Sequence, residues 1–428
     1  MEPTGKIPPQ PWMALPETQQ VMAALLNAGE QARFIGGCVR DSILKRDVQD
    51  VDIASPAPPE RVIEILQAAD IHVIPTGLAH GTVTAVLGQH RYEITTLRID
   101  HDTDGRRARV AYTNDWTQDA ARRDFTINAM SCDLDGNIYD PYDGIKDLST
   151  GYIRFVGHAH KRIEEDLLRL LRFYRFLAIY GRYPVNGDAL TACRDLAPRL
   201  GELSGERVRG ELFRILMAPN PATTLSKMIG EKVLPHILPE AGDVGRLRAV
   251  AWLKDSGIKV DAIEVDPVRR LAALLKPNLS PAEVNAVAER LKFSTRERKH
   301  LLAITASQPA ISVDINAHDL RLACYNVGTV VVVDRILLAW GGAVALEARL
   351  PKEQTQAWLQ CIEAALNWPG AVFPLRGRDI IALGVPHGPE VGILLSQVQD
   401  WWLENDFHPD HEGCLQTLKQ LIKPKTHP

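Results

Sequence analysis

The chain has 428 residues, of which 45% are hydrophobic and 24% are charged, and its formal net charge at pH 7 is −4. This length allows about three domains with an ample core, and the composition is that of an ordinary soluble globular protein. Six scattered cysteines without a CxxC pair indicate neither a zinc site nor a disulfide framework.

Net charge and apolar runs limit the classes of partner. The acidic balance does not exclude RNA, because residues 154–214 hold twelve Lys or Arg against eight Asp or Glu, and phosphate binding depends on local charge. The first 16 residues lack the apolar core of a signal peptide, and no run approaches membrane-spanning length. We therefore expect a cytoplasmic protein with no membrane partner.

A glycine-rich turn follows an early predicted strand. Residues 32–35 are short and apolar, and Gly36 and Gly37 permit a tight turn that a ligand can approach closely. A helix over residues 38–44 would aim unpaired backbone N–H groups at this turn, and Arg40 adds a cation. These features suit a triphosphate cradle, although an ordinary strand-turn-helix connection has the same pattern.

Two aspartates form the next signal. Alternation along a predicted strand puts Asp50 and Asp52 on one face, with the intervening apolar residues toward the core. Converging carboxylates repel each other unless a cation lies between them, and hard oxygen ligands suit Mg²⁺. We predict a metal site at these two residues, with Glu93 on a neighbouring strand as a candidate third carboxylate. The alternative is a solvated acidic loop.

Two cations and a carboxylate are adjacent at Arg122, Arg123 and Asp124. A guanidinium can fork onto phosphate or ribose oxygens, and a carboxylate can accept a bond from a sugar hydroxyl. Asn128 lies four residues on, where it would share their helical face. The alternative is a surface ion cluster.

Residues 158–180 have apolar side chains at helical spacing and predict one helix. Asp166, Arg169, Arg172 and Arg175 recur every third residue, so they would form one ridge along it. Three consecutive arginines in such a row repel one another, and the ridge therefore predicts an anionic ligand. A solvated charged face is the alternative.

The second half is less informative. Beyond about residue 220 the pattern is helical throughout, with loops marked by proline. A glycine-bearing turn at residues 386–393 opens a helix whose N–H groups could face a backbone phosphate, although helix capping explains it equally well. Trp401 and Trp402 could stack on bases, but paired aromatics are more often core or interface residues.

In this order the motifs resemble the nucleotidyltransferases of the DNA polymerase β superfamily, and within it the bacterial (class II) CCA-adding tRNA nucleotidyltransferases and their poly(A) polymerase relatives. The resemblance implies an α+β fold: a polymerase β-like nucleotidyltransferase head with a small mixed sheet, followed by all-α neck, body and tail domains. The expected boundaries give a catalytic head over residues 1–150, a neck with base recognition over 151–240, and a tRNA-binding body and tail over 241–428. The motifs that carry the resemblance are residues 36–41, 50–52, 122–130, 140–148, 165–172 and 206–208.

The resemblance also implies the reaction. The 3′-hydroxyl of a tRNA attacks the α-phosphorus of a bound nucleotide and pyrophosphate leaves, so that C, C and A are added from CTP and ATP without a template. Two Mg²⁺ ions on Asp50 and Asp52 would lower the pKa of the attacking hydroxyl and neutralise the leaving group. The expected partners are tRNA, CTP and ATP, with no stable protein partner.

Site residues are carried over position by position. By resemblance, Arg123 and Asp124 recognise the ribose and triphosphate, while Asp166 and Arg169 read the Watson–Crick edge of the base in place of a template. The remaining arginines of the ridge support the base or hold phosphate. The full set of expected nucleotide-binding residues is Gly36, Gly37, Arg40, Arg123, Asp124, Asp166, Arg169, Arg172 and Arg175.

Several alternatives stay open. Residues 100–109 are polar, charge-mixed and typical of a flexible loop, which in the family is needed for the switch from C to A addition. Its presence favours the complete activity over a CC-only enzyme, and a poly(A) polymerase is the other close alternative. His-Asp dipeptides at residues 101–102 and 318–319 leave a metal phosphohydrolase as a remote possibility. The other alternative is a non-catalytic RNA-binding protein built on a decayed transferase, against which the intact aspartates and the charged ridge argue.

Overall fold

The computed structural model describes residues 1–103, 108–255, 263–308, 310–347 and 349–422, without the side chains of residues 100–110. The chain divides into two compact units, which are considered separately. The first is Met1–Ala241 with Arg290–Lys292, and the second is Gly242–Glu289 with Phe293–Pro428. The three domains expected from the sequence, with boundaries after residues 150 and 240, stay a prediction.

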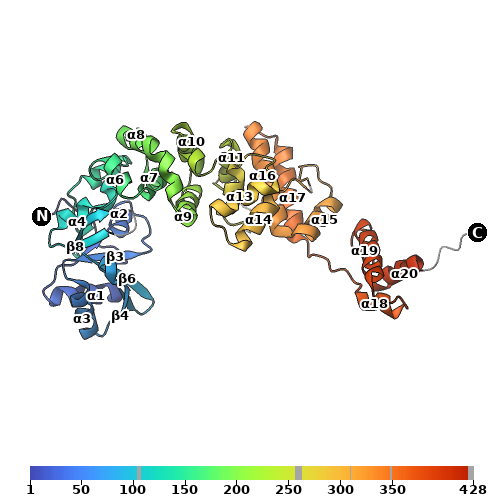
Figure 1. The fold of residues 1–428 in the computed structure, drawn as a ribbon, viewed down its shortest axis with the longest axis horizontal. Helices are drawn as coiled ribbons and strands as arrows, with labels where there is room; N and C mark the ends of the chain where they lie inside the picture. Colours follow the sequence, from blue (N-terminus) through green and yellow to red (C-terminus); the bar gives the residue numbers. More distant parts are fainter. Residues whose placement is uncertain (104–107, 256–262, 309, 348, 423–428) are drawn as a thin grey trace, which may run out of the picture. The chain divides into compact units, whose positions relative to one another are not determined.

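The first unit contains a mixed eight-stranded sheet (Figure 1). Strand β3 pairs with β6 in parallel and the other neighbours pair antiparallel, which confirms the predicted small mixed sheet. The strands in spatial order are β1 (Gly5–Lys6), β10 (Asn137–Tyr139), β9 (Ser131–Cys132), β2 (Arg33–Ile35), β3 (Val51–Ser55), β6 (His90–Thr96), β5 (Thr82–Leu87) and β4 (His72–Gly77).

Short helices pack against this sheet. Apolar residues of α1 and α3, such as Met22 and Leu66, are fully buried, as are Phe34 of β2 and Ile53 of β3. Their burial fixes the register of the central strands, because a shift by one residue would expose the same side chains. The helices of this part are α1 (Pro16–Asn27), α2 (Gly37–Ile43), α3 (Pro59–Ala68), α4 (Trp116–Ala121) and α5 (Gly144–Thr150).

The segment expected as a polar loop has regular backbone. Strand β7 (Arg98–Thr103) pairs antiparallel with β8 (Ala108–Tyr112) in a separate two-stranded sheet. The expectation of a loop is therefore wrong for residues 100–103 and 108–109, where the polar composition concealed strand pairing. Residues 104–107 of that segment lie outside the described residues.

A helical layer completes the first unit. Asp166 has φ −154° and ψ 106°, which is extended backbone, so the predicted helix over residues 158–180 is in fact two helices. In an aromatic cluster, Phe173 of the second of these helices packs against Phe155, which is bridged to Phe125, and the ring centroids are 5.8 Å (Phe155–Phe173) and 4.7 Å (Phe125–Phe155) apart. The helices are α6 (Ala159–Glu165), α7 (Leu168–Tyr180), α8 (Gly187–Leu196), α9 (Gly205–Leu216) and α10 (Pro221–Gly230).

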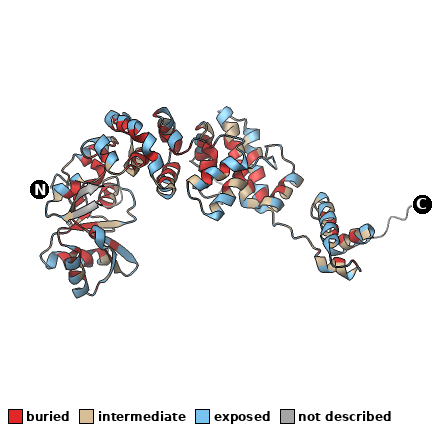
Figure 2. Cartoon of the chain, in the orientation of Figure 1, coloured by how far each residue is buried: buried red, intermediate tan, exposed pale blue. Residues whose placement is uncertain are grey.

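The second unit is built from helices, as predicted. Figure 2 shows that their buried faces lie on the inner sides of the packed helices. Trp402 is 2% exposed within the core of the last three helices, and Trp401 packs against that core, so both serve the interior rather than base stacking. The helices are α11 (Gly245–Asp255), α12 (Pro267–Leu274), α13 (Pro281–Arg290), α14 (Thr295–Thr305), α15 (Ala317–Val327), α16 (Thr329–Leu346), α17 (Lys352–Asn367), α18 (Gly377–Ala382), α19 (Pro389–Glu404) and α20 (His411–Ile422).

One helix, α16, is long and apolar enough to span a membrane by length and composition. The expectation that no run approaches this length is therefore wrong. Half of the helix is buried inside the second unit, where Val332, Ile336 and Trp340 belong to a hydrophobic core. Its charged residues Asp334 and Arg335 are also buried. These contacts are those of a central core helix.

Candidate active site

A polar cavity of about 580 Å³ lies in the first unit, between the glycine turn, the segment at residues 122–128 and helices α7 and α9. Every predicted site residue except Asp50 and the candidate third carboxylate Glu93 lines it. Its lining consists of Gly36, Gly37, Arg40, Asp52, Arg122, Arg123, Asp124, Asn128, Asp166, Leu168, Arg169, Arg172, Arg175, Phe176 and Arg207.

The glycine turn has the predicted conformation. Gly36 has φ 71° and ψ −122°, a backbone region that favours glycine, and α2 begins at the next residue. Arg40 is 8% exposed, donates from Nη1 to Asn128 Oδ1 at 2.6 Å and forms a two-point contact with Asp41. Its guanidinium is therefore held rigidly beside the turn, with most of its charge compensated by the neighbouring carboxylate.

Acidic residues meet at the edge of the cavity. Asp52 on β3 is paired in register with Glu93 on β6, which puts both side chains on one face of the sheet. Burial raises the pKa of Asp52 to about 6, with further upward contributions from Glu93 and Asp50 that Arg123 opposes. Asp50 is exposed and lies one residue before the strand, outside the cavity lining.

This edge has the chemistry of a divalent-cation site. The Asp52 carboxylate is desolvated beside like charges, which is unfavourable unless a cation compensates them, and its donors are hard oxygens. Asp50 and Asp52 were expected from strand alternation and Glu93 from a neighbouring strand, and the β3–β6 register places Asp52 beside Glu93. Their carboxylate oxygens are of the type that suits a divalent cation, and their role as its ligands stays a prediction.

An aspartate that the sequence reasoning missed organises the paired arginines. Asp119 on α4 contacts Arg122 Nη2 at 2.7 Å and Arg123 Nη2 at 3.1 Å. Burial opposes ionisation of Asp119, but the two arginines outweigh it and lower its pKa. The two arginines, which were expected to bind phosphate or ribose oxygens, therefore both contact one buried carboxylate.

Asp124 is held from two sides. Its carboxylate accepts bonds from Arg172 Nε at 2.7 Å and from Asn128 Nδ2 at 3.0 Å. Burial acts against ionisation, yet Arg172 and Asn128 lower the pKa of Asp124. Asn128 thus contacts Asp124, but it lies in a short 3₁₀ turn, Thr126–Asn128, and the expected shared helical face is wrong.

The ridge of charges has counterions in the protein. Arg169 Nη1 lies 2.6 Å from Glu165 and Arg175 Nη1 lies 3.0 Å from Glu211 on α9. Burial lowers the pKa of Arg175 to about 10, with Glu211 opposing. Repulsion within the row is therefore relieved by the nearby Glu165 and by Glu211 of α9, and the predicted anionic ligand stays a prediction. Asp166 lies before α7, not on its ridge.

Three polar lining residues were outside the predicted set. Arg122 and Asn128 border predicted residues in sequence, so the motif itself carried a signal for them. Arg207 belongs to the motif at residues 206–208 and was given no nucleotide-binding role, but it contacts the Asp166 carboxylate at 2.9 Å. The apolar walls formed by Leu168 and Phe176 had no sequence signal, because helical apolar residues at this spacing also fit a core.

Family models match both parts of this unit. A model described as the poly A polymerase head domain matches residues 32–154, and one described as a probable RNA and SrmB-binding site of polymerase A matches residues 185–243. A CCA-adding enzyme of Leuconostoc mesenteroides is 39% identical over 420 residues, which covers 95% of this chain and 96% of the relative. The chain belongs to the family of CCA-adding tRNA nucleotidyltransferases.

Other members agree with this assignment. The mitochondrial CCA tRNA nucleotidyltransferase 1 of Danio rerio is 33% identical and covers 91% of this chain and 87% of its own. The crystal structure of the Bacillus stearothermophilus CCA-adding enzyme in complex with CTP has a TM-score of 0.72 at 26% identity, covering 95% of this chain and 98% of that one. The predicted family and fold class are confirmed, and membership implies divalent metal use.

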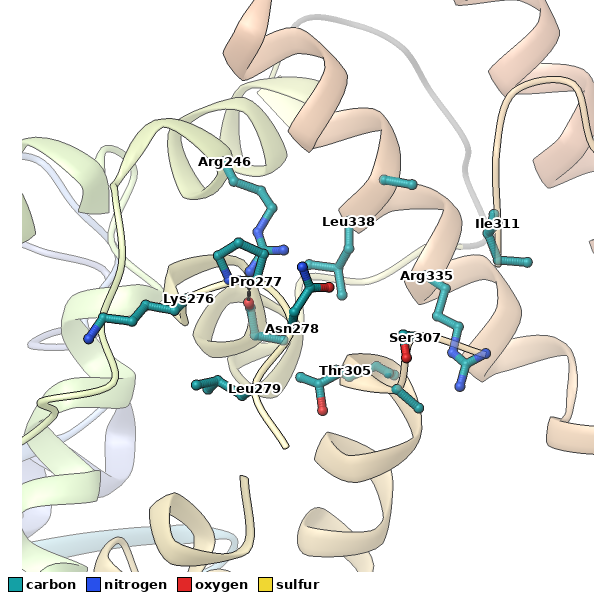
Figure 3. A pocket seen from close by; sticks show the side chains of 14 residues that line it. Arg246, Lys276, Pro277, Asn278, Leu279, Thr305, Ser307, Ile311, Arg335 and Leu338 are labelled. Atoms are coloured by element: carbon teal, nitrogen blue, oxygen red, sulfur yellow. Dashed lines mark hydrogen bonds between the residues drawn. The ribbon is translucent and has the colours of Figure 1, made fainter. Parts of the chain in front are cut away.

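The helical unit of this nucleotidyltransferase has a second, smaller cavity of about 190 Å³ (Figure 3). Arg246 at its wall donates to the main-chain carbonyls of Ala272, Ala273 and Leu275 at the end of α12. Figure 3 shows the Lys276 side chain extending away from Arg246, so these cations do not converge on one point. This arrangement stabilises the end of α12. It does not present a set of converging side chains that could recognise a nucleotide base.

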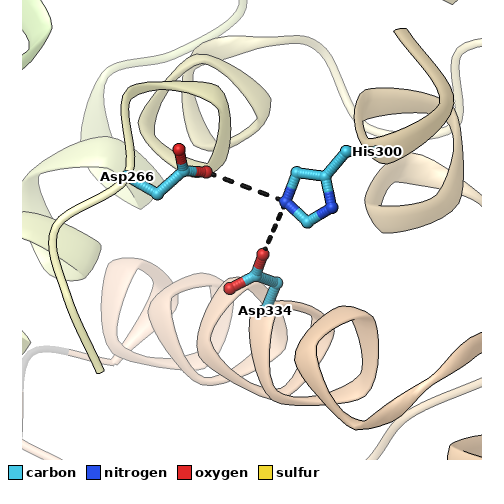
Figure 4. A group of neighbouring side chains, drawn as sticks. All are labelled: Asp266, His300 and Asp334. Atoms are coloured by element: carbon cyan, nitrogen blue, oxygen red, sulfur yellow. Dashed lines mark ion pairs between the residues drawn. The ribbon is translucent and has the colours of Figure 1, made fainter. Parts of the chain in front are cut away.

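The remote phosphohydrolase alternative gains no support from the described residues. His318 contacts Asp406 at 3.1 Å, and the side chains of residues 101–102 are not described. A His and Asp cluster does exist at Asp266, His300 and Asp334 (Figure 4). There Arg269 also bonds Asp334, and the two carboxylates raise the pKa of His300 to about 9. Two anions and two cations balance, so we interpret the cluster as a tie between helices.

Proposed function

We propose that the protein adds C, C and A to the 3′ end of tRNA from CTP and ATP, with release of pyrophosphate. The observation that carries this proposal is that one cavity contains both the Asp52 carboxylate, beside other acids, and the predicted base-reading pair Asp166 and Arg169. Chemistry and base selection would then act on one bound nucleotide without a nucleic-acid template. The names of the CCA-adding relatives support the same reading.

The residues divide the work by their chemistry. Asp50 and Asp52, with Glu93 as a third candidate, would hold Mg²⁺, which lowers the pKa of a hydroxyl and neutralises developing charge on phosphate. Arg40 and Arg123 present fixed guanidinium groups to the triphosphate. The 3′-hydroxyl oxygen forms a bond to the α-phosphorus. The bond between the α-phosphorus and the oxygen that bridges to the β-phosphorus breaks, and pyrophosphate leaves. The hydroxyl proton passes to water.

Base selection follows from acceptor and donor types. Asp166 accepts a bond from the exocyclic amino group that C and A share, and Arg169 donates to a ring or carbonyl acceptor. Asp124, fixed by Arg172, orients the sugar. Because these side chains are already positioned by protein contacts, they recognise the base with little loss of side-chain freedom. The protein would act in the cytoplasm, with no stable protein partner.

Extension of a tRNA that ends at the discriminator base tests this proposal. The protein would be incubated with Mg²⁺ and CTP, ATP, both, UTP or GTP, and the products separated at single-nucleotide resolution. Addition of CC with CTP alone and CCA with both is the expected result. Long A tails would instead identify a poly(A) polymerase, arrest at CC would identify a CC-adding enzyme, and no addition by a folded protein would contradict the proposal.

A further inference from the structure

The Asp166 carboxylate has a partner from another helix. Arg207 on α9 donates from one nitrogen, Nη2, to Oδ1 at 2.9 Å and to Oδ2 at 3.0 Å. The backbone N–H of Leu168 also donates to Oδ1, at 3.1 Å. Both charged side chains line the cavity and are about one-third exposed, at 32% for Arg207 and 27% for Asp166. The contact therefore lies where the base is proposed to bind.

These bonds use most of the acceptor capacity of the carboxylate. An ionised carboxylate offers about four lone-pair positions, two on each oxygen. Arg207 takes one position on each oxygen and Leu168 takes the second on Oδ1. One position remains, on Oδ2. A fixed oxygen that only accepts favours the amino group of C or A and repels the keto oxygen that U or G carries at the same place.

Arg207 is mounted on a well-packed helix. On α9, Val208 and Leu212 are buried, and Glu211 forms the ion pair with Arg175 of α7. Such packing limits the movement of the helix, so the Arg207 guanidinium approaches Asp166 from a fixed direction. By contrast, Asp166 itself lies in extended backbone between two helices, where its side chain depends on its bonds for orientation.

We propose that Arg207 is a positioning residue for base selection: it fixes the Asp166 carboxylate so that a single acceptor faces the incoming base. This inference rests on the proposed addition of C and A at the same cavity. Through this contact, Arg207 contributes to discrimination against UTP.

Steady-state extension by Arg207→Met, measured separately with CTP, ATP and UTP, tests the inference. We expect the ratio of kcat/KM for CTP over UTP to fall by about tenfold or more, mainly through a higher KM for CTP, because the loosened carboxylate no longer holds its acceptor toward the amino group of cytosine. The control Arg199→Met removes an arginine from an exposed pair with Glu202 and should leave the ratio unchanged. An unchanged ratio in a folded Arg207→Met protein would overturn the inference.

Two further variants separate positioning from structure. Arg207→Lys should restore part of the selectivity, because the contact uses a single nitrogen that an ammonium can replace, and it decides the question if Arg207→Met does not fold. In an Asp166→Ala background, Arg207→Met should change the ratio no further; an equal loss in both backgrounds would contradict action through Asp166. A wild-type protein that adds neither C nor A would instead defeat the proposed function.

Discussion

The arginines that line the larger cavity and those that line the smaller cavity of the helical unit contact different partners. In the cavity, Arg172 contacts Asp124 and Arg175 contacts Glu211, so charge is balanced by side chains around an open space. In the helical unit, Arg246 and Arg335 donate to main-chain carbonyls near the ends of helices. Carboxylate-paired cations around a cavity can exchange partners with a ligand, whereas carbonyl-bound cations complete the backbone hydrogen bonds of the fold.

The largest expected effect is on catalysis in the first region. Asp52→Asn should lower the rate of nucleotide addition by at least about a thousandfold, because the change removes charge from the predicted metal site with little change of shape. Binding of tRNA, measured by filter retention, should change little. Asp47→Asn, an exposed aspartate just upstream, is the matched control. Substantial turnover by Asp52→Asn would refute the metal assignment.

Asp124 tests the cost of breaking a balanced pair. Asp124→Asn leaves the Arg172 guanidinium without its carboxylate, so we expect unfolding free energy to fall by about 3 kcal/mol in urea titrations. Adding Arg172→Met should recover part of this loss. Glu202→Gln, at the exposed pair with Arg199, should change stability by less than about 0.5 kcal/mol. An equal loss of unfolding free energy at the Asp124–Arg172 pair and at the exposed Glu202–Arg199 pair would contradict a special role for the charge pairs of the cavity.

Arg246 tests the corresponding role in the helical unit. Arg246→Met deprives three main-chain carbonyls of their donor and should destabilise the protein by about 2 kcal/mol, while leaving kcat and KM for CTP unchanged. Arg248→Met, an exposed arginine on the same helix, is the control for stability. A strong change in KM without loss of stability would show that this cavity also binds substrate.

The smallest expected effect is a pH dependence of the helical unit. The folded pKa of His300, about 9, is above its ordinary value of 6.5, so its contribution to stability is fully present below about pH 6.5 and is lost as pH rises through about 9. Melting temperatures of wild type and His300→Gln should therefore converge at high pH. A constant offset for His300→Gln would contradict the tie between helices.

Local patterns in the sequence were sufficient for much of the head. The glycine turn, the helix after it and the strand containing Asp52 depend on neighbouring residues, and the structure has them within a residue or two of the expected bounds. The prediction of one continuous helix over residues 158–180 was wrong because the apolar spacing continues across Asp166, whose backbone is extended. Periodicity reports which face is apolar, but it does not reveal one residue that leaves the helix.

Long-range partners were the part that sequence reasoning could not supply. Glu211 and Arg207 contact Arg175 and Asp166 from a helix more than 30 residues away, so the row of arginines looked uncompensated. The same limit applies to α16, whose apolar run was overlooked because Asp334 and Arg335 interrupt it; both are buried among neighbouring helices. Pairing of this kind depends on tertiary packing and leaves no local pattern.

One cavity is proposed to bind both CTP and ATP and to recognise their bases without a template. Calorimetric titration of the tRNA-free protein with CTP, repeated in the presence of saturating ATP, tests it most directly. We expect one site per chain for which ATP competes with CTP, weak binding of UTP and GTP, and loss of binding for both nucleotides in Asp166→Ala. Simultaneous binding of CTP and ATP, or undiminished binding in the folded Asp166→Ala protein, would contradict the account.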